Sequence, residues 1–128
     1  MQTIDQQYAD IVRQKVLEIQ PEPDYTKYGA MAHKLPILVY TAGLLQALEF
    51  VCSRGEPIQK RLIEHLALTI GQPDTPALMK TVREADLRVY MRLTRQVFAA
   101  LLWYKRFAQS ILKVTPTEDM SGDAINHD

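Results

Sequence analysis

The chain has 128 residues, 47% hydrophobic and 23% charged, and its 15 Lys and Arg balance 15 Asp and Glu to a formal net charge of zero. This length and composition predict one globular domain with a single core, and the lone cysteine, Cys52, excludes an internal disulfide and a CxxC motif. The apolar runs are far shorter than a bilayer span and no signal peptide is visible, so we expect a cytoplasmic protein without membrane contact.

The first third of the chain is predicted to form helices separated by prolines and glycines. Apolar residues recur at steps of three and four over residues 3–20, with Ile4 and Tyr8 on the apolar face, which is typical of an amphipathic helix. The prolines of QPEPD end it. A second helix is expected to start near Asp24, with a kink or a restart at Pro36.

The middle of the chain continues the helical pattern. A bend is expected at Gly43, followed by an apolar helical segment at 44–52. Gly55 suits the end of that helix, and Pro57 suits the first turn of the next, which stops at the GQP of residues 71–73.

The last helical pattern begins with Thr75 as the expected N-cap and runs to Lys113. That length is unusual for a small domain, so a break is expected near residues 83–86, which would place Glu84 and Asp86 in the first turn of the final helix. The sequence contains no sustained alternation of apolar and polar residues, so no β-strand is predicted. We therefore predict an all-α fold, a single compact bundle of five to seven helices with a long basic C-terminal helix.

Charge is distributed unevenly along this neutral chain. Residues 114–128 hold four acidic residues and no Lys or Arg, whereas residues 1–113 hold 15 basic and 11 acidic residues, a net charge of +4. We expect residues 1–113 to form the helical domain and residues 114–128 to form an acidic, flexible tail. Local concentration of cations is what polyanion binding requires.

The stretch 88–113 contains six cations and no Asp or Glu. At about 100° per residue, five of the six fall within a sector of about 60°, a stripe roughly 38 Å long. The five are Arg88, Arg92, Arg95, Arg106 and Lys113. The opposite side is the expected core face, with Val89, Leu93, Val97, Ala100, Tyr104, Phe107 and Ile111.

This stripe has two interpretations, a solvated surface or a polyanion contact. Solvated faces mix both signs of charge, whereas Arg88 and Arg92 are like charges one turn apart, which costs stability. Arginine also suits phosphate because of its planar, forked guanidinium.

Beside the stripe lie Met91, Phe98 and Leu102, which either reach the core or form a seam to another subunit.

Residues for catalysis or metal binding are not grouped in the sequence. His33 and His65 have no His or Cys at i+3 or i+4, and no nucleotide-binding or hydrolase motif occurs. We interpret both histidines as half-buried or surface side chains and Cys52 as a buried, inert thiol. We expect no metal, no cofactor and no enzymatic activity.

Two stretches, residues 28–50 and 90–110, resemble the small subunit of the type III-B CRISPR RNA-guided effector, the Cmr complex. The N-terminal MQTIDQQYA and the chain length are similar as well. The sequence departs from the family pattern at Thr41-Ala42 and at Tyr104. The residues that carry the resemblance are Tyr28-Gly29, Lys34-Leu35-Pro36, Gly43-Leu44 with Gln46, and Trp103 followed by Lys105-Arg106-Phe107-Ala108.

The resemblance implies an all-helical, non-catalytic subunit whose copies stack head to tail as a short filament. Its implied partners are the backbone and large subunits of the effector, further copies of itself, and the guide RNA–target RNA duplex, whose channel it helps to line. Cations of such a subunit meet phosphates without reading bases. The implied RNA-backbone contacts are Lys34, Arg88, Arg92, Arg95, Lys105, Arg106 and Lys113, and Met91, Phe98 and Leu102 are the candidate subunit interface.

Two other functions remain open from the sequence. One is a protein-only helical adaptor whose basic stripe binds an acidic partner. The other is a DNA-binding regulator, which would need a short helix–turn–helix with base-reading side chains, and we locate none.

Overall fold

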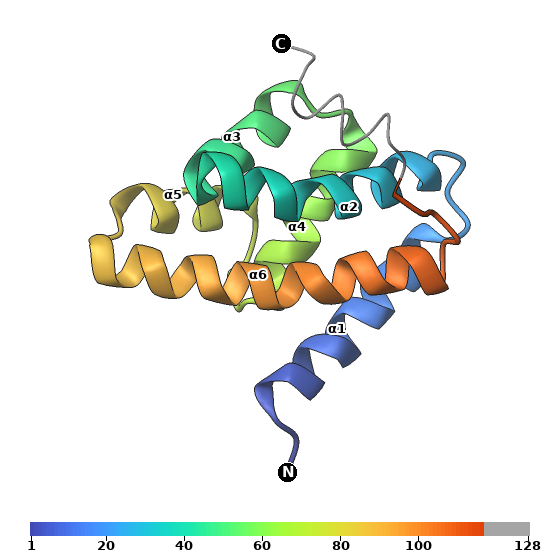
Figure 1. Cartoon of the computed structure of the whole chain (residues 1–128), viewed down its shortest axis with the longest axis horizontal. Coiled ribbons are helices and arrows are strands. Elements are labelled where there is room, and N and C mark those ends of the chain that lie inside the picture. The colour runs from blue at the N-terminus through green and yellow to red at the C-terminus, as the bar shows by residue number, and fades with distance from the viewer. Residues whose placement is uncertain (117–128) are drawn as a thin grey trace.

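The computed structural model describes residues 1–116, which form six α-helices and no strand (Figure 1). The prediction of an all-α bundle of five to seven helices is confirmed. In chain order the helices are α1 (Ile4–Ile19), α2 (Tyr25–Ala42), α3 (Leu44–Arg54), α4 (Pro57–Thr69), α5 (Thr75–Glu84) and α6 (Leu87–Ser110).

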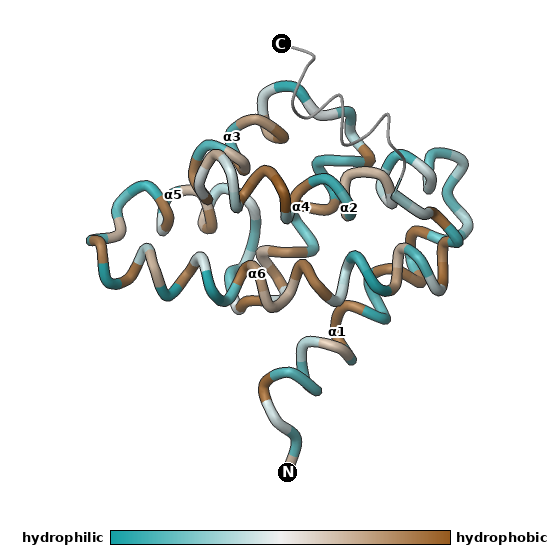
Figure 2. Tube along the Cα trace, in the orientation of Figure 1, coloured by the Kyte–Doolittle hydropathy of each residue, from teal (hydrophilic) through white to brown (hydrophobic). Residues whose placement is uncertain are grey.

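Helix α4 is the centre of the bundle, since it contacts all five other helices. Helix α6 runs along one side of the molecule, with α2 packed beside it and α1 crossing it obliquely (Figure 1). The N-terminal end of α1 extends away from the rest of the bundle. Hydrophobic and hydrophilic residues alternate along α6 (Figure 2), so this helix has one buried and one exposed face.

Side-chain caps define where several helices begin. Thr3 and Gln6 form a capping box at α1, and Asp86 accepts a hydrogen bond from the Val89 N–H at the start of α6. The expected cap at Thr75 is wrong, because the Asp74 side chain accepts from the Ala77 N–H and Thr75 is the first helical residue. The break near residues 83–86 is confirmed, although Glu84 ends α5 instead of opening α6.

Helix α2 continues through Pro36 without interruption, so of the two predicted alternatives, a kink or a restart, the restart is wrong. Pro36 is itself buried, and α2 packs against α3, α4 and α6, so tertiary packing stabilises a helix that has lost one internal hydrogen bond. The bend at Gly43 is confirmed. Its φ of 93° is a left-handed conformation that other residues rarely adopt, and it lets α3 start at the next residue.

The chain after α6 folds back onto α2. Val114 donates its N–H to the Ala108 carbonyl, and its side chain lies so close to Gly29 that a Cβ there would be 2.7 Å from the Val114 Cβ. The His33 Nε2–H donates to the Val114 carbonyl at 2.7 Å. Residues 117–128, most of the predicted acidic tail, lie outside the described residues, so the tail stays a prediction.

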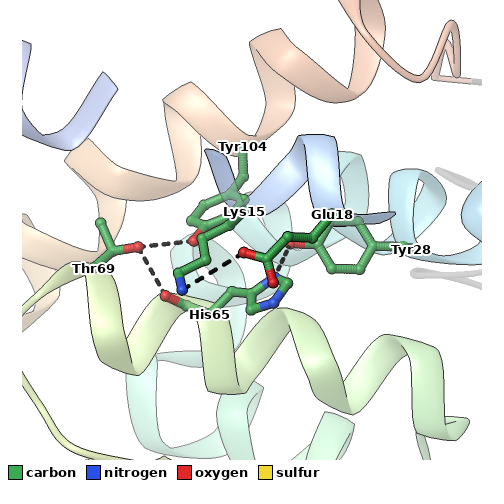
Figure 3. Close-up of polar contacts among 6 residues, drawn as sticks. All are labelled: Lys15, Glu18, Tyr28, His65, Thr69 and Tyr104. Atoms are coloured by element: carbon green, nitrogen blue, oxygen red, sulfur yellow. Dashed lines mark hydrogen bonds and ion pairs between the residues drawn. The ribbon is translucent and has the colours of Figure 1, made fainter. Parts of the chain in front are cut away.

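A buried polar network connects the central helices (Figure 3). The Tyr28 hydroxyl and the His65 Nδ1 are 2.7 Å apart. The Thr69 hydroxyl donates to the His65 carbonyl and therefore accepts from the Tyr104 hydroxyl, 2.7 Å away. Both His33 and His65 are buried, which corrects their interpretation as half-buried or surface side chains. Periodicity could not show this because each imidazole needs a particular partner from a distant part of the chain.

Candidate nucleic-acid interface

Helix α6 builds the candidate site by burying one face and exposing the other. Of the expected core face, Leu93, Val97, Ala100 and Tyr104 are buried, whereas Val89, Phe107 and Ile111 are partly buried against the same core. Leu101 and Ala108 are also buried. The arginines Arg88, Arg92, Arg95 and Arg106 point away from this core and are exposed.

These four residues, Arg88, Arg92, Arg95 and Arg106, are the arginine face of α6. Over 18 residues at 1.5 Å per residue, the face extends about 27 Å. The predicted stripe is shorter than expected because α6 ends at Ser110. Lys113 lies beyond the helix with a φ of 60°, so it is exposed but not part of the regular face.

The other two lysines predicted to contact RNA, Lys34 and Lys105, also lie outside the arginine face. Lys105 is half-buried, and its charge makes a small addition to the effect of burial, which is the main cause of the lowered pKa of His33. Lys34 is half-buried on α2, with its Nζ 5.8 Å from the centre of the Phe50 ring. Neither lysine is fully exposed, so neither is part of the arginine face.

No ion pair in residues 1–116 involves a cation of α6. The three ion pairs of this part of the chain are Lys15–Glu18, Lys27–Glu56 and Arg61–Glu22. The arginine face is therefore a surface of like charge, which is unfavourable in isolation and favours a bound anion.

Exposed apolar side chains accompany the arginines. Met91 is 50% exposed and Leu102 is 53% exposed, so neither reaches the core, whereas Phe98 packs against it. The sequence reasoning missed Leu87, which is 75% exposed and lines a shallow groove with Arg88, Met91 and Arg95. Its position as the first residue of α6, where neighbouring elements give little cover, is the only sequence signal for it.

The N-terminal turns of α1 form a wall beside the arginine face. Ile4 and Tyr8 line a second groove together with Arg92 and Arg95. Ile4 was expected in the core but is 67% exposed. Its helix extends past the bundle at that end (Figure 1), which an amphipathic pattern alone cannot reveal.

Trp103 joins α1 to α6 at the other end of the arginine face. Its Nε1–H donates to the Asp5 Oδ1 at 2.9 Å. Its ring is stacked on Phe107, with centroids 5.7 Å apart and an interplanar angle of 24°. The Arg106 guanidinium lies 5.1 Å from the centre of the Trp103 ring, a cation–π distance.

Burial raises the pKa of Tyr8, which lines the groove beside the arginine face, and other groups with altered pKa values lie elsewhere in the fold. Burial lowers the pKa of His33, lowers the pKa of His65 to about 4, and raises the pKa of the Cys52 thiol, so all three are uncharged at neutral pH. The part of the chain that the structure describes holds no cluster of three or more potential metal ligands, and none of its helices is long and apolar enough to cross a membrane.

This small all-helical chain matches a known class of CRISPR-associated proteins. A family model described as "CRISPR-associated protein (Cas_Cmr5)" matches residues 4–111. A relative named "CRISPR system Cmr subunit Cmr5", from Thermus thermophilus, is 45% identical over 113 residues, which is 88% of this chain and 99% of the relative.

The fold agrees with this match. An X-ray crystal structure of a CRISPR-associated Cmr5 family protein from Thermus thermophilus is similar with a TM-score of 0.85 and 46% identity, covering 88% of this chain and 99% of that one. The chain therefore belongs to the Cmr5 family of CRISPR-associated proteins, which confirms the resemblance drawn from residues 28–50 and 90–110.

Proposed function

We propose that this protein is a structural, non-catalytic subunit of the type III-B CRISPR Cmr complex, a ribonucleoprotein of antiviral defence in the cytoplasm. Its arginine face meets phosphates of the guide RNA–target RNA duplex, and its partners are the backbone and large subunits of the complex. Membership of the Cmr5 family supports the place in the complex.

The observation that carries the RNA contact is the arginine face itself. Four exposed arginines extend along one side of α6, and none is ion-paired within residues 1–116. Phosphate contacts made by such a surface supply affinity and position, whereas sequence choice comes from base pairing between guide and target.

Copies of the subunit stack head to tail in this proposal. Head-to-tail stacking needs two different faces on each copy. The exposed Met91 and Leu102, with Leu87, supply apolar area for one such face, and arginine and methionine are enriched at protein interfaces.

The same apolar side chains favour the second candidate, a protein-only adaptor. In that case the arginine face and Met91 contact an acidic protein surface, and RNA plays no part. A DNA-binding regulator has no comparable support in the structure.

Reconstitution of the complex with and without this subunit tests the proposal. Filter binding of a guide–target duplex should be weaker without the subunit, with a smaller salt dependence, because each phosphate contact contributes about 0.7 to 0.9 to the slope of log K against log salt. The adaptor function predicts loss of protein assembly, and retention of the subunit after ribonuclease treatment, with no change in salt slope for the complexes that still form.

A further inference from the structure

Arg106 differs from the other members of the arginine face in its surroundings. Its guanidinium is held 5.1 Å from the centre of the Trp103 ring. In residues 1–116 the remaining three arginines of the face have no such aromatic partner. A free arginine side chain carries about 2 kcal/mol of rotamer entropy, which is partly lost when it binds a phosphate. A guanidinium already held on a ring loses less.

The Trp103 ring is itself fixed from two sides. Phe107, one turn further along α6, stacks on it, and the Asp5 carboxylate of α1 accepts its indole N–H at 2.9 Å. The two hydrogen-bonded residues are 98 positions apart in the sequence, so this contact exists only in the folded chain. The orientation of the ring therefore depends on α1 lying across α6.

Asp5 is not an ion-pair partner of Arg106. No ion pair within 4.0 Å joins the two in the described part of the chain. The carboxylate is engaged by a neutral indole, and the guanidinium keeps its hydrogen-bond donors for an external anion.

We propose that Asp5 and Trp103 are positioning residues that hold Arg106 in the orientation needed to meet an RNA phosphate. The inference rests on the proposed function, since it assumes that the arginine face contacts RNA. Neither Asp5 nor Trp103 touches the RNA in this arrangement. Both act through Arg106.

The alternative is that Asp5 only attaches α1 to α6. The two possibilities predict opposite effects of removing the carboxylate. A merely structural carboxylate close to an RNA backbone repels it, so its loss should strengthen RNA binding. A positioning carboxylate orders Arg106, so loss of its hydrogen bond should weaken binding.

Asp5→Asn and Asp5→Ala form a matched pair for this test. Both remove the charge, but only asparagine retains an oxygen that accepts the Trp103 N–H. In the reconstituted complex, measured by filter binding of a guide–target duplex, Asp5→Ala should bind about two- to fivefold more weakly than Asp5→Asn. This is the range expected if Arg106 loses the benefit of one exposed cation–π interaction once the Trp103 ring is no longer held in place. Trp103→Phe should show a similar loss of affinity.

Arg106→Ala completes the experiment. If Asp5 acts through Arg106, adding Asp5→Ala to Arg106→Ala should cause no further loss of affinity. Equal affinities for Asp5→Ala and Asp5→Asn, alongside a clear loss for Arg106→Ala, would overturn the positioning role and leave the proposed function standing. An unchanged affinity for Arg106→Ala would overturn both the RNA contact at this residue and the positioning role.

Fluorescence of the isolated chain provides a readout that does not depend on RNA. Trp103 is the only tryptophan in the sequence, so the emission spectrum reports its surroundings directly. Asp5→Ala should shift the emission and Asp5→Asn should leave it close to that of the unaltered chain. Identical spectra for the two variants would contradict the claim that the hydrogen bond fixes the ring.

Discussion

At the scale of one residue, His65 shows how burial in the core suppresses protonation of an imidazole. The ring is buried, and its Nδ1 lies 2.7 Å from the Tyr28 hydroxyl. Burial lowers the pKa of His65 to about 4, with a smaller opposing effect of Glu18 and smaller lowering effects of Arg61 and Lys15. In the unfolded chain the same imidazole has a pKa of about 6.5.

The free energy of unfolding should therefore fall as the pH is lowered from about 6.5 toward 4. In this window the unfolded chain takes up a proton that the folded chain does not, so acid favours unfolding. Between about pH 7 and about pH 5 the loss from His65 amounts to about 2 kcal/mol. Urea unfolding at both pH values measures it. His65→Gln, which cannot titrate, should lose less stability over the same interval, and an equal loss in both proteins would disprove the assignment to His65.

Gly29 is the second residue whose role depends on a distant contact. It lies inside α2, where glycine is a poor helix former, but the Val114 side chain occupies the space that a Cβ would fill. Gly29→Ala should therefore destabilise the fold by about 1–3 kcal/mol, the cost of overpacking.

The effect of Gly29→Ala on stability should change sign in a protein that also carries Val114→Gly, and this makes the prediction specific to Val114. Val114→Gly removes the atoms that a Cβ at position 29 would meet. In that background Gly29→Ala should stabilise the protein by up to about 1 kcal/mol, through helix propensity. Thermal unfolding of the four proteins measures the cycle. If Gly29→Ala destabilised both backgrounds equally, Val114 would not be the cause.

At the scale of the element, the buried face of α6 stabilises the fold, and its exposed face carries the arginines proposed to bind RNA. Leu93 is buried, and its neighbour Arg92 is exposed. Leu93→Ala should cost about 2–5 kcal/mol of unfolding free energy, the usual range for a leucine truncated in a core. Arg92→Ala should change it by no more than about 0.5 kcal/mol. Chemical denaturation of the two variants measures the difference, and a large loss for Arg92→Ala would show that the arginine face is part of the fold.

The two faces of α6 could be predicted from the sequence because helical periodicity is a local property. Leu93, Val97 and Tyr104 recur at the helical period and are buried, and Arg88 and Arg106 lie opposite them. Where α6 ends could not be predicted in this way. Lys113 fits the same period but lies beyond the helix with a φ of 60°, next to Val114, which contacts the sequence-distant helix α2.

The remainder of the candidate site depends on tertiary contacts, so it could not be predicted from the sequence. Ile4 has a core-like position in the pattern of α1, yet the helix extends past the bundle and leaves it exposed. Lys34 belongs to a motif that carries the family resemblance but lies half-buried on α2 beside Phe50, and is not one of the exposed cations of α6. The pairing of Asp5 with Trp103 joins residues from opposite ends of the chain. No local pattern indicates such a contact.

At the scale of the whole molecule, the proposed role is structural. The purified protein should therefore cleave neither RNA nor DNA, with or without divalent metal ions, when incubated with labelled strands and analysed on denaturing gels. Its described residues group no ligands for a catalytic metal. Metal-dependent cleavage that a single substitution in this chain abolishes would contradict the non-catalytic role.

Contact between the arginine face of the assembled subunit and RNA phosphates is the core of the proposed function. It is tested by the affinity and salt dependence of target binding in a reconstituted complex that carries Arg92→Ala and Arg95→Ala together. Both residues are exposed on the same face, so the fold should be preserved, and assembly of the variant complex is checked before binding is measured. Binding should be weaker to a similar degree for unrelated target sequences, and the salt slope should fall by about 0.7 to 0.9 for each phosphate that the variant no longer neutralises. Normal assembly with unchanged affinity and unchanged salt slope would refute the proposal, and the arginine face would then be a protein-facing or solvated surface.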